Sequence, residues 1–221
     1  MPRDRAHARA LQAEFARQGD PVGWFDQLYR DADGDTAAVP WADLRGNALV
    51  EAWIDQTRFA VRGRACAVVG CGLGDDAEAL AAAGADVTAF DISPTAIAWC
   101  RRRFPNSRVQ YVVADLFDLP PAWPRRFDLV VEINTLQALP GEIRPRAIER
   151  VADLVAPGGT LLVICRGREV DEPADGPPWP LVRGELDAFA KLGLTPTFQR
   201  DVRDDDTPPA RRFVAAFTRP R

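Results

Sequence analysis

The stretch AVVGCGLGDDAEAL, residues 67–80, decides the fold of this chain. A short apolar run, typical of a buried strand, ends in three glycines at alternate positions, Gly70, Gly72 and Gly74, and an alanine-rich helical pattern follows. In doubly wound α/β folds, such a turn from a strand into a helix binds the ligand, outside the carboxyl ends of the strands. Glycine removes side chains where the backbone has to approach that ligand closely. The stretch therefore predicts a ligand-binding loop on an α/β sheet.

The residues after this loop indicate what kind of ligand it accepts. A dinucleotide-binding GxGxxG pattern would need a third glycine at position 75, where the chain has Asp75. A pyrophosphate at the N-terminus of the helix would meet Asp75 and Asp76, which is electrostatically unfavourable. A cationic or zwitterionic ligand meets no such penalty. The alternative explanation is a structural tight turn followed by two acids that stabilise the start of a helix.

Two further acids stand at the carboxyl ends of the next predicted strands. Asp91 ends the second strand, about 20 positions after Gly70, where an acid can bind both ribose hydroxyls of an adenosine-containing ligand. Asp115 ends the third strand, in VVADLFDLP, where it could reach an adenine amino group. Each aspartate alone is more often a turn residue. The glycine loop and the two acids in this order favour a ligand that contains adenosine.

Apolar runs that alternate with helical segments predict a parallel sheet. Such runs lack polar alternation, so both faces of the sheet are expected to be covered by helices. Two more strand candidates follow near the C-terminus, joined by the loop RDDDTPPA, and predict a closing antiparallel hairpin. The predicted fold is a doubly wound, Rossmann-like α/β sheet of seven strands, mostly parallel, at 65–69, 86–91, 108–115, 127–133, 160–165, 194–202 and 211–218.

The N-terminal part of the chain contains no strand pattern. Helices are expected at 4–18, 21–30 and 47–58. At 221 residues the chain is predicted to form one domain. Within it, residues 1–60 are expected to be a helical lid over an α/β core of residues 61–221.

Composition excludes several classes of function. The net charge of −4 argues against nucleic-acid binding, and no apolar stretch approaches the roughly 20 residues of a membrane span. The N-terminus lacks the apolar segment of a signal peptide. The four cysteines form no CxxC pair and no metal-ligand spacing, so we expect reduced thiols, no metal and a cytoplasmic protein. His7 is the only histidine, which argues against a histidine base.

At this point the motifs GCGLGDDAEAL, VTAFDIS, VVADLFDLP, FDLVVEINTLQALP and LVAPGGTLLVI together resemble a class I S-adenosylmethionine-dependent methyltransferase, over about residues 65–165. The resemblance implies S-adenosyl-L-methionine as cofactor, with its methionine part on the glycine loop and its ribose and adenine on the two later acids. One departure is Val68, where most members carry an acid. Carried over by position, the cofactor-binding residues are Gly70, Cys71, Gly72, Gly74, Asp91, Ile92, Asp115 and Leu116; Trp41 and Glu132 are further candidates.

Two stretches outside these motifs point to a branch of that family. GDTAAVPWADLRGNALVEAW (34–53) and GPPWPLVRGEL (176–186) resemble segments of thiopurine-methyltransferase-like proteins. That branch implies direct methyl transfer to a small soft nucleophile, often a thiol. Chemistry agrees, because a thiol supplies some thiolate at neutral pH whereas a phenol or alcohol usually needs a base such as His or Lys. The chain has one of each, His7 and Lys191, and neither is near a predicted strand end.

The remaining site candidates surround the expected position of the methyl group. Glu132 or Asp43 could serve as a base, and Gln137 would lie beside the transferring methyl. Arg166 could bind an acidic substrate or lower the pKa of a thiol; the alternative is a surface position with no role in the site. The substrate-binding candidates are Trp24, Tyr29, Asn134, Arg166 and Trp179.

Other functions remain open from the sequence. A nicotinamide-dependent oxidoreductase is disfavoured by the missing third glycine and by the absence of a Tyr-x-x-x-Lys pair. An O- or N-methyltransferase of a small metabolite and a non-catalytic S-adenosylmethionine-binding protein are the alternatives. We expect a small-molecule acceptor, no nucleic-acid or membrane partner, and a monomer or homodimer.

Overall fold

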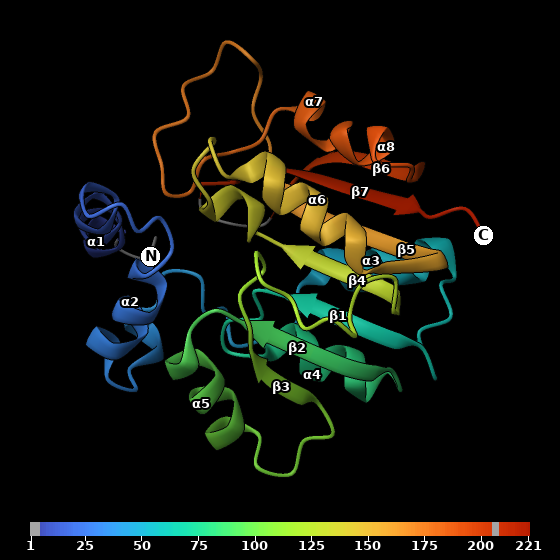
Figure 1. Cartoon of the computed structure of the whole chain (residues 1–221), viewed down its shortest axis with the longest axis horizontal. Helices are drawn as coiled ribbons and strands as arrows, with labels where there is room; N and C mark the ends of the chain where they lie inside the picture. The colour runs from blue at the N-terminus through green and yellow to red at the C-terminus, as the bar shows by residue number, and fades with distance from the viewer. Residues whose placement is uncertain (1–4, 205–207) are drawn as a thin grey trace.

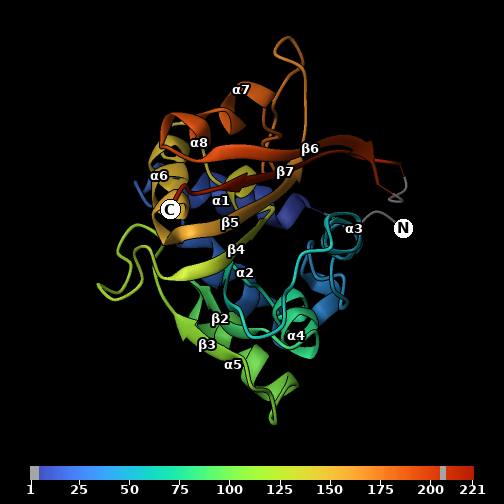
Figure 2. The same ribbon diagram turned by 90° about the vertical axis from the view of Figure 1, so that its right-hand side faces the viewer.

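The structure is a computed structural model that describes residues 5–204 and 208–221. It contains a seven-stranded sheet of order β3-β2-β1-β4-β5-β7-β6 with helices on both faces, as Figures 1 and 2 show. The predicted α/β fold is therefore confirmed. Residue 4, where the first helix was expected to begin, and residues 205–207 of the expected hairpin loop lie outside the described residues.

The strands follow the apolar runs of the sequence. Five strands are parallel, and β7 runs antiparallel between β5 and β6, which gives the predicted closing hairpin. β5 starts at Val155 rather than Thr160, because Val155 pairs with Phe127 before a shift of register that takes in the PGG turn. The strands are β1 (Ala65–Val69), β2 (Asp86–Asp91), β3 (Gln110–Val113), β4 (Phe127–Ile133), β5 (Val155–Arg166), β6 (Thr195–Arg203) and β7 (Arg211–Thr218).

Both faces of the sheet are buried because successive side chains of each strand point to opposite sides. Ala67 and Val69 of β1 pack in the core under α6 (Arg144–Leu154), α7 (Arg183–Leu186) and α8 (Ala188–Lys191). Cys66 and Val68 belong to the core on the other face, under α3 (Ala48–Thr57), α4 (Asp75–Ala82) and α5 (Pro94–Arg103). Figure 2 shows these two helical layers on either side of the strands. The short 3-10 helices η1 (Thr36–Ala38) and η2 (Leu136–Ala138) lie in connecting segments.

The N-terminal helices divide between two places. α1 (Ala6–Arg17) and α2 (Trp24–Ala32) lie beyond the arrowheads of β1 and β2 (Figure 1), where Trp24 and Leu28 share a core cluster with Trp99 of α5. The third helix, α3, instead packs on a face of the sheet through Val50 and Trp53. α3, which was expected within a lid of residues 1–60, therefore packs with the α/β core, and the lid itself stays a prediction.

Candidate active site

The three glycines of the loop after β1 have left-handed backbones that only glycine adopts readily, with φ of +59°, +52° and +88° at Gly70, Gly72 and Gly74. A Cβ atom at Gly70 would lie 2.4 Å from the Oγ1 atom of Thr135, which itself donates a hydrogen bond to the Val69 carbonyl. A Cβ at Gly74 would lie 2.5 Å from the hydroxyl of Tyr111. The loop is thus packed between β3 and the turn that follows β4, and its shape depends on the glycines.

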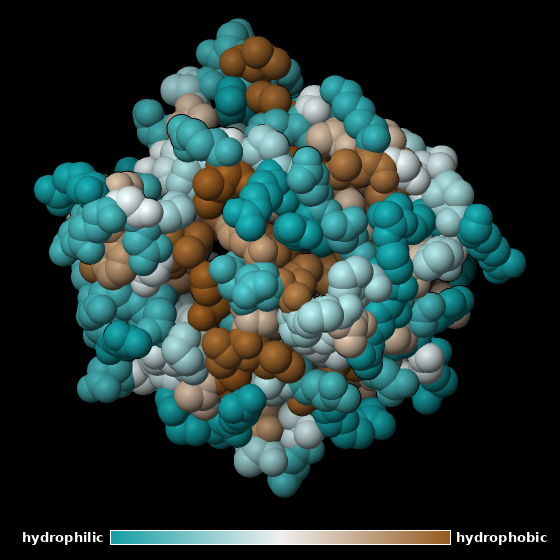
Figure 3. Space-filling model, viewed as in Figure 1, coloured by the Kyte–Doolittle hydropathy of each residue, from teal (hydrophilic) through white to brown (hydrophobic). Residues whose placement is uncertain are grey.

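A cavity of about 1210 Å³ lies over this loop, outside the carboxyl ends of the central strands. Its volume exceeds the roughly 300–1,000 Å³ of typical small-molecule sites, so a cofactor and a small acceptor fit together. Apolar side chains follow the boundary between the N-terminal helices and the sheet in Figure 3. The structure brings these predicted site residues into the lining: Trp24, Tyr29, Trp41, Asp43, Gly70, Cys71, Gly72, Asp91, Ile92, Asp115, Leu116, Asn134, Gln137 and Arg166.

Asp91 links the glycine loop to the segment before α5 by hydrogen bonds. Its side chain is buried, and its two carboxylate oxygens accept hydrogen bonds of 2.9 Å from the backbone N–H groups of Gly72 and Ser93. Burial raises the pKa of Asp91, partly offset by these two hydrogen bonds. Each carboxylate oxygen can accept more than one hydrogen bond, so Asp91 retains capacity for hydroxyl groups in the cavity.

The strand next to Asp91 supplies a second acid. Asp115 lines the cavity after β3 and accepts a hydrogen bond of 2.8 Å from the N–H of Phe117, which fixes the turn. Ile92 and Leu116 flank it with apolar side chains in the same lining. A glycine cradle, one buried acid and a second acid between apolar groups fit a methionine, ribose and adenine in that order, so the site fits S-adenosylmethionine.

Aromatic residues of the N-terminal segment cover the glycine loop. The indole Nε1 of Trp41 donates a 2.7 Å hydrogen bond to the Tyr29 hydroxyl, and this hydroxyl would be 3.2 Å from a Cβ at Gly72. Burial, together with the charge of Asp91, keeps the pKa of Tyr29 well above its ordinary value, so the phenol is neutral. Trp24 packs edge-on against Trp41, with ring centroids 6.0 Å apart. Tyr29 and Trp41 therefore lie at the cofactor end of the cavity.

The other end of the cavity is lined by amides and arginines. The side-chain carbonyl of Gln137 accepts a hydrogen bond from the Arg166 N–H, whereas its amide nitrogen has no partner among the described residues. Asn134, with φ of +63°, accepts a 3.0 Å hydrogen bond from Arg212. These groups can donate hydrogen bonds to an acceptor molecule or stabilise negative charge on it.

Sequence reasoning missed several residues of this wall. The GPPW motif was noted for its tryptophan, yet the lining includes the two prolines before it. Arg203 of β6 and Arg212 of β7 come from the C-terminal hairpin. No local motif marks them, because only the strand order brings β6 and β7 to the site. The missed residues include Thr135, Pro177, Pro178, Arg203 and Arg212.

Three predicted residues are not in the cavity lining. Glu132 is fully buried, accepts a hydrogen bond from the N–H of Leu136, and has a pKa raised to about 7 by burial. Its carboxylate has no exposed surface in this cavity, so the roles expected for it as a base and as a cofactor contact stay predictions. The backbone N–H of Trp179 donates a 2.7 Å hydrogen bond to the backbone carbonyl of Gln137, and Trp179 does not line the cavity. Gly74 packs against Tyr111 rather than facing the cavity.

Asp43 remains the exposed carboxylate among the proposed bases. It lines the cavity, and its charge contributes to the raised pKa of Asp76 at the start of α4. The pKa of Asp76 is raised to about 6, and burial of its carboxyl is the largest cause. Asp43 thus belongs to the rim near the glycine loop.

Other kinds of site find no support in the described part of the chain. No group of three His, Cys, Asp or Glu residues there has the arrangement of a metal site. Across residues 5–204 and 208–221, no helix is both long and apolar enough to cross a membrane.

Comparisons with known proteins agree with this geometry. Residues 67–159 match a family model described as a methyltransferase domain. The chain is 32% identical over 176 residues to a probable thiol methyltransferase 2 of Arabidopsis thaliana, an alignment that covers 78% of this chain and 73% of that protein. It is also 39% identical over 109 residues to a ubiquinone biosynthesis O-methyltransferase of Xanthomonas campestris pv. campestris, covering 48% of this chain and 44% of that one.

A solved structure shares the fold at lower identity. The N-methyltransferase NodS of Bradyrhizobium japonicum WM9, in complex with S-adenosyl-L-homocysteine, superposes with a TM-score of 0.68 at 20% identity, covering 89% of this chain and 100% of that one. The fold, the glycine loop with its two following acids, and the thiol methyltransferase relative lead to one conclusion. The chain belongs to the class I S-adenosylmethionine-dependent methyltransferases, with S-adenosylmethionine as its cofactor.

Proposed function

We propose that this methyltransferase acts on a small soft nucleophile, a thiol before a phenol or an amine, by direct in-line displacement. The observation that carries the proposal is the composition of the cavity wall. Across its described lining there is no His and no Lys, and the carboxylate of Asp204 at the acceptor end is paired with Arg212. A thiol is suited to such a site because it ionises near neutral pH without an enzymic base. The 32% identical thiol methyltransferase supports the same class.

The wall residues have defined roles in this proposal. S-adenosylmethionine supplies an electrophilic methyl group on a positively charged sulfur. The free amide N–H groups of Gln137 hold the acceptor, and the positive charge of Arg166 favours its thiolate form. The apolar groups Pro177 and Pro178 exclude water from the attacking sulfur, which raises its reactivity. The new bond joins the acceptor sulfur to the methyl carbon as the bond from that carbon to the cofactor sulfur breaks.

A panel of acceptors tests the proposal. Thiophenol, phenol and aniline are offered with isotopically labelled cofactor, and methylated products are measured by mass spectrometry. We expect thiophenol to react first, with a rate that rises with pH through the pKa of the acceptor itself. Methylation of phenol with no reaction of thiophenol contradicts the proposed acceptor class.

The second candidate is an O-methyltransferase of a small metabolite. Asp43, an exposed carboxylate in the cavity lining, favours it because a phenol needs a base, and one relative is an O-methyltransferase. Asp43→Asn separates the two candidates. If a phenol is the natural acceptor, this variant loses phenol methylation, whereas thiol methylation does not depend on Asp43.

A further inference from the structure

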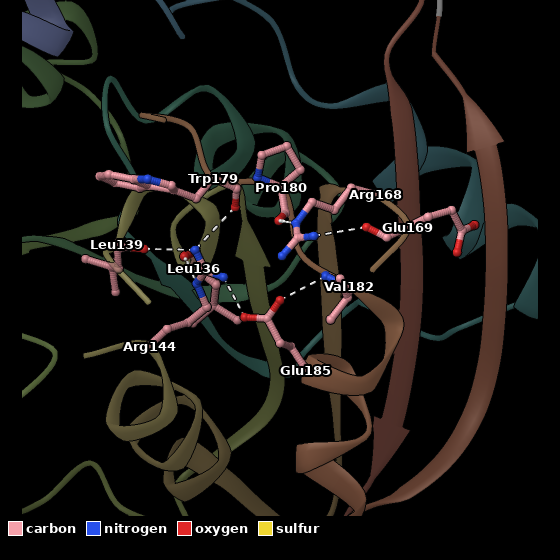
Figure 4. A network of polar contacts seen from close by, with 9 residues as sticks. All are labelled: Leu136, Leu139, Arg144, Arg168, Glu169, Trp179, Pro180, Val182 and Glu185. Carbon is pink, nitrogen blue, oxygen red and sulfur yellow. Dashed lines mark hydrogen bonds and ion pairs between the residues drawn. The ribbon is translucent and has the colours of Figure 1, made fainter. Parts of the chain in front are cut away.

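A buried arginine lies directly behind the acceptor end of the cavity. Arg144, the first residue of α6, is 5% exposed and does not itself line the cavity. Its guanidinium donates to four acceptors on two separate segments, as Figure 4 shows. The acceptors are the backbone carbonyls of Leu136 at 2.9 Å, Leu139 at 3.0 Å and Trp179 at 3.3 Å, and the carboxylate of Glu185.

The two segments that Arg144 joins form the acceptor wall. The first, residues 136–139, carries Gln137, and the second, residues 177–185, begins with the two prolines of the lining. The two segments also contact each other, because the backbone N–H of Trp179 donates a 2.7 Å hydrogen bond to the backbone carbonyl of Gln137. Arg144 therefore donates hydrogen bonds to both segments of the wall, on the side away from the cavity.

Glu185 fixes the second segment to this arginine. One of its carboxylate oxygens pairs with Arg144, and the other accepts a 2.8 Å hydrogen bond from the N–H of Val182 at the start of α7. A buried guanidinium is stable only when its N–H groups are satisfied in good geometry. The planar fork of Arg144 thus allows few relative positions of the two segments.

We propose that Arg144, held by Glu185, is a positioning residue that sets the spacing between Gln137 and the Pro177–Pro178 turn, and with it the alignment of the acceptor. This inference rests on the proposed function, because it concerns the acceptor end of the same cavity. A displacement of about 1 Å at a reacting centre can slow a reaction roughly a hundredfold. The arginine therefore acts through the wall and not by contact with the acceptor.

The experiment compares three single variants and the double variant of Arg144→Lys with Glu185→Gln. Arg144→Lys keeps the charge and removes the fork, and Glu185→Gln removes the charge that anchors it. Arg219→Lys is the matched control, because Arg219 is equally buried, at 6% exposed, and also donates to backbone carbonyls at the other end of α6, those of Ala152 and Val155. Binding of S-adenosyl-L-homocysteine, kinetics with thiophenol, and hydrogen exchange of residues 134–140 and 176–185 are measured for each.

We expect the first two variants to lower kcat/KM for thiophenol by roughly tenfold to a hundredfold. Affinity for S-adenosyl-L-homocysteine should stay unchanged, and both wall segments should exchange faster together. The double variant should lose no more than the stronger single variant, because the two residues act as one unit. If Arg144→Lys does not fold, Glu185→Gln carries the same comparison.

Three results overturn the inference: an equal loss in Arg219→Lys, a parallel loss of cofactor affinity, or unchanged exchange of both segments. A failure of the proposed function is distinguished by the acceptor that the natural-sequence protein methylates. If the natural-sequence protein methylates phenol or aniline instead of thiophenol, the kinetics are repeated with that acceptor. If it methylates none of them, the exchange measured with S-adenosyl-L-homocysteine bound decides whether Arg144 holds the wall.

Discussion

At the scale of single residues, Asp91 combines two tasks in one side chain. Its carboxylate lines the cavity and holds the glycine loop through the N–H of Gly72, and we predict that it also binds the ribose of the cofactor. Asp91→Ala should therefore weaken binding of S-adenosyl-L-homocysteine by about 1.5–3 kcal/mol for each charge-assisted hydrogen bond lost. Calorimetric titration measures this. Asp86→Ala, at the exposed opposite end of β2, is the control and should bind normally; equal affinity of both variants contradicts the assignment.

Asp76 gives a pH-dependent prediction. Its pKa is raised from 3.8 to about 6, chiefly by burial, so the native protein binds a proton more tightly than the unfolded chain. Stability should consequently fall as the pH rises from about 4 to above 6. Asp76→Asn removes the buried charge and keeps an oxygen that can accept the 2.6 Å hydrogen bond from the Asn47 N–H.

The Asp76→Asn variant should melt about 2–4 °C higher than the natural sequence at pH 7.5, equivalent to about 1 kcal/mol in a chain of this size. The difference should shrink as the pH falls through 6 and vanish well below pH 3.8, where the aspartate is protonated in both states. Thermal melting across this pH range measures it. A variant that is less stable at pH 7.5 shows that the charged form of Asp76 stabilises the start of α4 instead.

Most residues that the motifs predicted for the cofactor line one cavity, because they follow neighbouring strands of the same parallel sheet. Asp91 and Asp115 stand at strand ends, and parallel strands bring their carboxyl ends to one edge of the sheet. Glu132 shows the limit of such reasoning. It lies two residues after Val130 on β4, so both side chains point to the face that α6 covers. Its position just before the segment that carries Asn134 and Gln137 did not reveal which face the side chain takes.

At the scale of elements, hydrogen bonds to Asp26 join α2 to the start of α5, beside the predicted cofactor site. Asp26 accepts hydrogen bonds from the Ser93 hydroxyl at 2.7 Å and the Thr95 N–H at 3.1 Å, at the start of α5. Burial acts to raise the pKa of Asp26, but these hydrogen bonds outweigh it and leave the pKa below its ordinary value. The attachment is therefore strongest above pH 4 and weakens as the carboxylate is protonated.

Asp26→Ala should loosen α2 from α5 and speed hydrogen exchange of residues 24–32. Binding of S-adenosyl-L-homocysteine should restore part of the protection, because Tyr29 and Trp41 cover the glycine loop where it binds. The control is Asp31→Ala, which removes contacts to His7 and Gln27 but none to the core. Exchange that is the same with and without the ligand in every variant means that α2 is fixed packing and not a closing lid.

Element boundaries were predictable where the apolar pattern is unambiguous. β1, β2, β4 and β7 begin and end where the sequence placed them. The pattern failed at β5, since the PGG turn is absorbed into the strand by a shift of register with β4, which is a contact between distant segments. It also did not reveal that α3 packs on a face of the sheet. Whether an amphipathic helix covers the face or the edge of a sheet depends on the assembled fold.

At the scale of the whole molecule, the strand order divides the cavity into two parts. The carboxyl ends of β1, β2 and β3 carry the loop and acids that fit the cofactor. The ends of β4, β5, β6 and β7 carry the amides and arginines of the acceptor wall. Most residues that the sequence predicted for the first part line the cavity, and their contacts with the cofactor stay a prediction. The second part depends on the C-terminal hairpin, whose place in the sheet is a long-range property.

This division predicts that acceptor use and cofactor binding can be changed separately. Gln137 is buried in the acceptor wall, its carbonyl is held by the Arg166 N–H, and its amide nitrogen is without a partner in the described residues. Gln137→Leu keeps a side chain of similar size and removes the donors. The KM for thiophenol should rise roughly tenfold, about 1.4 kcal/mol, whereas affinity for S-adenosyl-L-homocysteine should stay constant. Asp91→Ala should show the opposite pattern. If both variants weaken cofactor and acceptor binding equally, the two ends of the cavity do not act independently, and the roles assigned to the two groups of strand ends are wrong.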